Sequence, residues 1–142
     1  MYSDPIFDFY VTMTAPPTTI LRGPEPLLYV TDIYRSVAFY TEQLGFTVTE
    51  SYRPHDQLCW CRLERGGAAF MLQSASEKDG SPSERTHGII FYFFCTDADA
   101  LHAEFTAAGL ALDPPQKTFY GMNQLSLNDP DGYSLCFQNQ IA

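Results

Sequence analysis

The residues that most often carry catalysis are sparse in this sequence. No serine, histidine and carboxylate stand in a motif that would pair a nucleophile with its base, and no glycine-rich phosphate loop occurs. His55 lies in a predicted loop and His102 on an exposed-looking helical stretch, so we expect both imidazoles to be solvated. Cys59 and Cys61 have the spacing of a soft-metal pair, but on one strand face they should behave as small core residues. The sequence therefore shows no obvious reagent for catalysis.

Groups suited to binding are better represented. Trp60 offers a flat ring for stacking, and Arg62 and Gln73 offer polar groups beside it. Tyr92 and Phe94 are predicted to lie on a facing strand. We expect a ligand cavity lined by Tyr29, Trp60, Arg62, Met71, Gln73, Tyr92, Phe94, Met122, Gln124 and Cys136.

Two predicted hairpins decide which of these side chains share a face of a sheet. Gly66-Gly67 suits a two-residue turn with positive φ, which places Trp60 beside Gln73. Alternation along the strands then separates the ligand-binding residues from a helix-facing apolar set, namely Cys59, Cys61, Leu63, Phe70 and Leu72.

The second hairpin turns at Asp129-Pro130-Asp131-Gly132, where proline presets φ and glycine takes the left-handed position. Its apolar set is Leu125, Leu127, Leu135 and Phe137. The opposite side carries Gln124, Ser126, Ser134, Cys136 and Gln138, which could line a cavity or simply meet solvent or a neighbouring sheet.

The elements that position these residues occur twice along the chain. A strand at 27–30 is followed by Thr31-Asp32, a helical periodicity and Gly45, and a strand at 89–95 by Thr96-Asp97, a helix and Gly109. Three strand-like segments follow each helix, at 46–52, 58–64 and 69–74 and again at 116–119, 122–128 and 133–138. The sequence predicts an α+β fold of two tandem βαβββ modules, about 24–75 and 87–140, whose curved mixed sheets form a cup-shaped cavity. An N-terminal arm, 1–22, precedes this single domain, 23–142.

The charge balance excludes several classes of partner. The 142 residues include 17 acidic and 8 basic side chains, which gives a net charge of −9. This charge opposes contact with nucleic acid and anionic lipid, and it either keeps the protein soluble or attracts cationic ligands. Four cysteines without a disulfide pattern and the absence of a secretory signal or membrane span predict a cytoplasmic protein.

The ordered motifs resemble the vicinal oxygen chelate superfamily, the glyoxalase/bleomycin resistance/dioxygenase group, and most closely its bleomycin-resistance-type members. The resemblance covers about residues 24–140. It rests on Tyr29-Val30-Thr31-Asp32 with Ser36, Phe39-Tyr40 and Leu44-Gly45-Phe46, on Thr96-Asp97-Ala98-Asp99-Ala100-Leu101, and on Tyr120-Gly121-Met122 before Asp129-Pro130-Asp131-Gly132-Tyr133. It implies paired βαβββ modules, cup-shaped sheets and a homodimer.

The resemblance also identifies where metal-dependent members hold a divalent ion. The four positions fall on Glu25, Met71, Ile90 and Cys136, of which Glu25 alone supplies an oxygen ligand. His87 is three residues before the position at Ile90 and of the wrong strand parity. We therefore predict no metal and no other cofactor.

Two functions remain open at this stage. The first is a homodimeric binding protein that sequesters a planar or cationic small molecule without metal. The alternative is an enzyme of the same superfamily, either a metal-dependent lyase or dioxygenase or a metal-free isomerase. Ile6, Phe7 and Phe9 of the arm are costly to leave in water, and they favour coverage of a sheet edge or a partner subunit.

Overall fold

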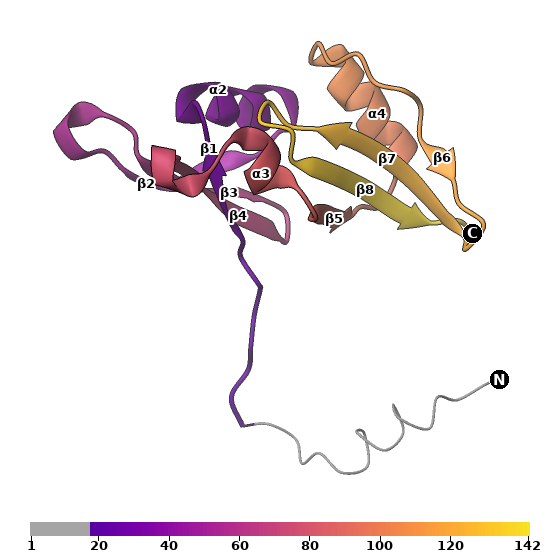
Figure 1. Ribbon diagram of the computed structural model, residues 1–142. Helices are drawn as coiled ribbons and strands as arrows, with labels where there is room; N and C mark the ends of the chain where they lie inside the picture. Colours follow the sequence, from indigo (N-terminus) through magenta and orange to yellow (C-terminus); the bar gives the residue numbers. More distant parts are fainter. Residues whose placement is uncertain (1–17) are drawn as a thin grey trace.

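A computed structural model of the chain describes residues 18–142, which form two modules side by side (Figure 1). The predicted arm residues Ile6, Phe7 and Phe9 lie outside these described residues. Each module has one four-stranded mixed sheet, ordered β1-β4-β3-β2 and β5-β8-β7-β6. The predicted α+β fold with two tandem modules is confirmed, and the two sheets do not close into a barrel.

The first module, indigo to magenta in Figure 1, begins at residue 27. Its strands are β1 (Leu27–Val30), β2 (Thr47–Tyr52), β3 (Trp60–Arg65) and β4 (Ala68–Ser74). The second module, red to yellow, contains β5 (Ile90–Phe94), β6 (Gln116–Lys117), β7 (Met122–Asn128) and β8 (Ser134–Gln140). Within each module the first strand pairs in parallel with the fourth, and the other pairs are antiparallel.

Helices cover one face of each sheet. The first module carries α2 (Ile33–Ala38), extended by the π-helical turn η1 (Phe39–Gln43), and the second carries α4 (Ala98–Ala107). The predicted caps are present, because the Asp32 carboxylate accepts from the backbone N–H of Tyr34 and Arg35, and Asp97 accepts from Ala100. Gly45 ends the first helical segment with a φ of +76°, a conformation that glycine adopts without strain.

The connection between the modules contains short helices that the sequence did not predict. They are η3 (Glu77–Asp79) and α3 (Pro82–Thr86), and a further one, η2 (Pro54–Asp56), lies between β2 and β3. Ser81 caps α3 by accepting from the Glu84 N–H, and Pro82 occupies its first turn. None of the helices in the described part of the chain is long and apolar enough to cross a membrane.

The predicted register of the first hairpin and the predicted turn of the second are confirmed. Trp60 pairs with Gln73 and Arg65 with Ala68, and in the second module Ser126 pairs with Cys136. One side of each strand is consequently buried under the helices, as Cys61, Leu63, Phe70, Leu72, Leu125 and Leu135 show. Cys59 departs from the prediction, because it lies just before β3 and is only half-buried.

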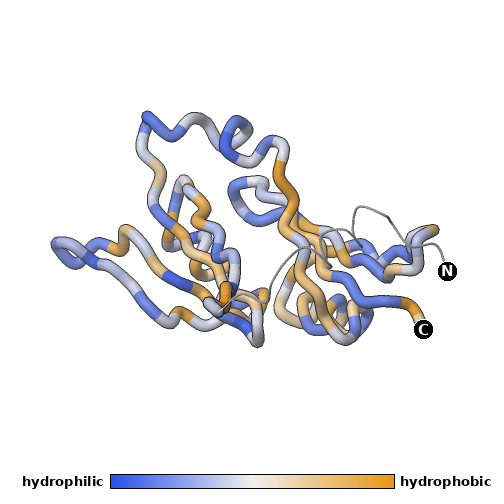
Figure 2. Tube along the Cα trace, turned by 90° about the horizontal axis from the view of Figure 1, so that it is seen from below, coloured by the Kyte–Doolittle hydropathy of each residue, from blue (hydrophilic) through white to orange (hydrophobic). Residues whose placement is uncertain are grey.

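The apolar core continues from one module into the other. Phe46 and Phe70 of the first module lie 6.0 Å and 6.4 Å from Phe93 of β5, measured between ring centroids. Phe93 in turn stacks on Phe137 at 4.8 Å. In Figure 2, hydrophobic stretches, drawn in orange, run through both modules. This shared core fixes the two sheets relative to each other.

Candidate functional site

The side of each sheet that faces away from the helices, hereafter its open face, carries the predicted ligand-binding residues. On the first sheet, cross-strand pairing aligns Tyr29, Gln73, Trp60 and Tyr52 in one row across all four strands. The next row contains Leu27, Met71, Arg62 and Glu50. Tyr29 and Tyr52 are exposed and Trp60 is half-buried, so the row presents three aromatic rings with an amide among them.

Arg62 does not present the free guanidinium that the sequence suggested. Its Nε donates to Glu25 Oε1 at 2.6 Å and its Nη1 to Glu64 Oε2 at 2.7 Å, while Nη1 also reaches Thr49 Oγ1 at 3.0 Å. The hydrogen bond from Arg62 lowers the pKa of Glu25, so that carboxylate is held ionised. Two carboxylates against one guanidinium leave this part of the open face acidic.

The four positions that would hold a metal ion do not form a ligand set. Glu25 is engaged by Arg62, Met71 lies on β4, and Ile90 and Cys136 are not cross-strand partners, since Ile90 pairs with Ser134. Burial raises the pKa of the Cys136 thiol, which disfavours the thiolate that a metal needs. Within residues 18–142, no group of three or more His, Cys, Asp or Glu side chains could hold a metal ion. The side chains present do not fit a divalent metal.

The histidines occupy three unrelated places. His87 follows α3 and is exposed, and His55 lies in η2 with a φ of +54°. His102 is not simply solvated as expected, because its Nε2 lies 3.0 Å from the carbonyl oxygen of Leu112 and the residue is half-buried. That contact ties α4 to the segment before β6.

The open face of the second sheet has a different chemistry. Its rows contain Ile90, Ser134 and Asn128, then Tyr92, Cys136 and Ser126, then Phe94, Gln138 and Gln124. These nine side chains are uncharged. Tyr92 and Phe94 are 51% and 81% exposed, whereas Cys136 is buried. A depression of about 360 Å³ on this face is lined by Tyr92, Gln124, Ser126 and Cys136, among others.

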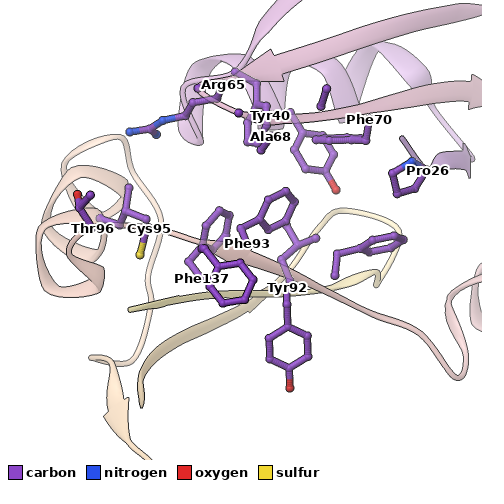
Figure 3. A pocket seen from close by; sticks show the side chains of 18 of the residues that line it. Pro26, Tyr40, Arg65, Ala68, Phe70, Tyr92, Phe93, Cys95, Thr96 and Phe137 are labelled. Atoms are coloured by element: carbon purple, nitrogen blue, oxygen red, sulfur yellow. The ribbon is translucent and has the colours of Figure 1, made fainter. Parts of the chain in front are cut away.

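A larger cavity of about 990 Å³ lies between the modules, on the side of their shared core (Figure 3). Its walls include Tyr40 and Phe70 from one module and Phe93 and Phe137 from the other. Tyr92 and Phe94 belong to its lining, although the Tyr92 ring turns away from Phe93 and Phe137 in Figure 3.

The ten predicted ligand-binding residues thus form two groups. Neither cavity is lined by Tyr29, Trp60, Arg62, Met71 or Gln73, all on the first sheet. Gln124 and Cys136 line the depression, and Met122 lines neither cavity, although its place on β7 puts it on the same open face as Gln124. The structure therefore places the set on two open faces of one chain, without joining them in one cavity.

Asp129-Pro130-Asp131-Gly132 was predicted to form a turn and counted among the motifs of the resemblance, but its part in a clasp between the modules was not predicted. The inter-module clasp consists of Asp129 and Asp131 with Thr31, Arg35, Tyr40 and Arg85. Asp131 Oδ2 accepts from the Thr31 N–H at 2.8 Å and from Arg85 Nη2 at 2.7 Å, and Asp131 Oδ1 accepts from Arg35 Nη2 at 3.2 Å. In the sequence, the second aspartate was the signal of a further role for this segment. The Asp129 side chain alone accepts the backbone N–H groups of the turn, so the turn does not need Asp131.

Asp129 completes the clasp. Its Oδ1 accepts from the backbone N–H groups of Asp131, Gly132 and Tyr133, and its Oδ2 accepts from the Tyr40 hydroxyl at 2.7 Å. Burial raises the pKa of both Asp129 and Tyr40. The clasp also supports the open face, because the Tyr133 hydroxyl and Arg85 Nε both donate to the carbonyl oxygen of Tyr29.

Residues 22–137 match the family model described as the Glyoxalase/Bleomycin resistance protein/Dioxygenase superfamily. Among curated proteins, none matches the chain in sequence.

Solved structures share the fold at low sequence identity. A bleomycin-binding protein from bleomycin-producing Streptomyces verticillus, complexed with copper(II)-bleomycin, is 20% identical with a TM-score of 0.66, covering 88% of this chain and 99% of its own. TnmS3, an antibiotic binding protein from Streptomyces sp. CB03234, is 20% identical with a TM-score of 0.66, over 86% and 98% of the two chains. A glyoxalase/bleomycin resistance protein/dioxygenase from Nocardioides is 18% identical with a TM-score of 0.66, over 96% and 92%.

Proposed function

Since the chain belongs to the glyoxalase/bleomycin resistance protein/dioxygenase superfamily, we propose that it is a binding protein that sequesters a small planar or cationic compound without a metal ion. The observation that carries this proposal is the row of Tyr29, Trp60 and Tyr52 on the first open face, next to the carboxylates that Arg62 holds. Aromatic rings bind flat ligands by stacking, and nearby negative charge favours a cation. Two proteins with this fold are described as binding bleomycin and an antibiotic, which agrees with the proposal.

Titration with two tricyclic dyes of the same ring system tests this function. Proflavine is a planar cation at pH 8, and acridine is neutral at that pH. Because Trp60 is the only tryptophan, its emission reports on the first open face without labels. We expect proflavine to quench the Trp60 emission at concentrations about tenfold lower than acridine. If neither dye changes the emission, the proposed function is wrong.

The proposal includes a homodimer in the cytoplasm. Ile89 and Ile90 are 45% and 55% exposed at the start of β5, whose outer edge has no paired strand within residues 18–142. An exposed apolar edge of this kind is costly in water and is usually covered. The four cysteines are free thiols, which is consistent with a reducing compartment. Light scattering at micromolar concentration should give twice the 16.0 kDa of one chain, and a stable monomer would refute the dimer.

A further inference from the structure

A chain of polar side chains crosses the open face of the second sheet. Gln124 on β7 and Gln138 on β8 are cross-strand partners, and Phe94 on β5 is the next partner of Gln138 in the same row. Gln124 Nε2 donates to Gln138 Oε1 and to the Tyr120 hydroxyl, both at 2.9 Å. Tyr120 stands in the turn before β7, so its ring closes one end of the row.

The hydrogen-bonding capacity of these two amides is only half used. A glutamine amide has two N–H donors and one carbonyl acceptor. Both donors of Gln124 and the carbonyl of Gln138 are engaged, which leaves Gln124 Oε1 and Gln138 Nε2 without a partner within residues 18–142. Neither atom is sealed from solvent, because Ser36 Oγ is the one buried side-chain nitrogen or oxygen without a partner in that range. One carbonyl acceptor and two N–H donors are therefore open to a ligand, on amides that are joined by the 2.9 Å hydrogen bond from Gln124 Nε2 to Gln138 Oε1.

The surroundings favour a neutral and flat ligand. The rows of this face contain hydroxyl, thiol, amide and aromatic groups but no charged side chain. Phe94 is 81% exposed directly beside Gln138, so one of its ring faces is free to stack on a planar group. The adjoining depression of about 360 Å³ includes Gln124 and lies within the usual size range of small-molecule sites.

We propose that this face is a recognition site for a neutral planar group that carries an N–H donor next to a carbonyl acceptor, such as a lactam. The ligand N–H donates to Gln124 Oε1, the ligand carbonyl accepts from Gln138 Nε2, and the ring stacks on Phe94. This inference rests on the proposed function, because it specifies which part of a bound small molecule the second module holds. The first module, with its carboxylates, takes the cationic part.

A pair of probes that differ in one hydrogen-bond donor tests the site. The first probe, 2-quinolone, has the lactam edge, whereas 1-methyl-2-quinolone keeps the ring and the carbonyl but lacks the N–H. Binding is followed by NMR through the side-chain amide signals of Gln124 and Gln138. We expect 2-quinolone to shift these signals and to bind at least tenfold more tightly than its methylated analogue, because a missing donor leaves a polar group unpaired.

Two matched variants separate recognition from general changes in charge. Gln138→Glu keeps the acceptor for Gln124 but replaces the free donor by a carboxylate oxygen, and it should weaken 2-quinolone binding at least tenfold. Gln140→Glu makes the same change two residues further along β8, outside the amide chain, and should bind 2-quinolone like the original protein. Equal binding of the two quinolones, or unchanged binding by Gln138→Glu, would overturn the lactam site.

The proposed function is measured separately on the same samples through proflavine and Trp60. If proflavine binds and 2-quinolone does not, the lactam site is wrong and the proposed function stands. If 2-quinolone binds as expected and proflavine does not, the lactam site stands and the cationic part of the proposed function is wrong. If neither probe binds, the lactam site and the proposed function are both wrong.

Discussion

Replacing Asp131 by asparagine should destabilise the protein more than any other single change in the inter-module clasp. The Asp131 side chain has no exposed surface and accepts from Thr31, Arg35 and Arg85. Asparagine keeps the shape, and its oxygen can still accept from Thr31 and Arg85. The negative charge is lost, however, and Arg85, whose side chain is 7% exposed, keeps a buried positive charge without compensation.

The expected loss follows from the burial of the two partners. Breaking a buried ion pair from one side typically costs about 3–5 kcal/mol, because the remaining charge stays desolvated. The pair with Arg35 is different, since that side chain is 52% exposed and can turn into water. Exposed ion pairs contribute about 0–1 kcal/mol. Asp131→Asn should therefore lower the free energy of unfolding by about 3–5 kcal/mol and Arg35→Met by no more than about 1 kcal/mol.

Urea unfolding of these variants and of Arg85→Met measures the effect, and the double variant Asp131→Asn/Arg85→Met completes a thermodynamic cycle. The two single changes should not add, because each one removes the same buried pair. If Asp131→Asn costs less than about 1 kcal/mol, or if the double variant equals the sum of the singles, the buried pair does not hold the modules together.

Three further outcomes test the site and the core. Trp60→Ala should weaken proflavine binding about tenfold, because it removes a stacking surface. Calorimetry measures this loss of proflavine affinity. Leu63→Ala, on the buried side of β3, should lower the free energy of unfolding by about 2–5 kcal/mol. Burial raises the pKa of Asp129 above its ordinary 3.8, so the folded protein retains this proton to higher pH than the unfolded chain. The stabilisation by protonated Asp129 is full below pH 3.8 and is lost as the pH rises through the folded pKa. The urea midpoint of the original protein, measured against that of the Asp129→Asn variant, should therefore fall over this pH range. After loading with zinc, nickel, iron or manganese, elemental analysis should find no stoichiometric metal, whereas one tightly held ion per chain would favour the enzyme alternative.

The faces of the strands were predictable because they follow from local rules. Gly66-Gly67 fixes the partner of Trp60 through the turn, and alternation then assigns every residue of β3 and β4 to a side. The caps at Asp32 and Asp97 are equally local. These features depend on neighbours a few residues apart, and a single sequence contains that information.

The contacts between distant residues were not predictable. Arg62 was expected to meet a ligand, but Glu25, 37 residues away, engages it, and no pattern in one sequence indicates that pairing. Asp131 and Thr31 are 100 residues apart, and Arg85 lies in a segment without periodicity. The cavity between the modules depends on how two sheets meet, which neither hairpin determines. Predictions on the arm remain untested, because its first 17 residues lie outside those described.

The alternation of buried and open side chains has a consequence for how such a protein can change. Every second residue of β3, β4 and β7 is buried on the helix side, and the residues between them lie on the open face and are less buried. Strand β8 is the exception, because Leu135, Cys136, Phe137 and Gln138 are all buried. Substitutions at exposed positions usually change stability by less than about 0.5 kcal/mol. Selection or laboratory evolution could therefore change the ligand preference of one module without changing that of the other, and with little loss of folding stability.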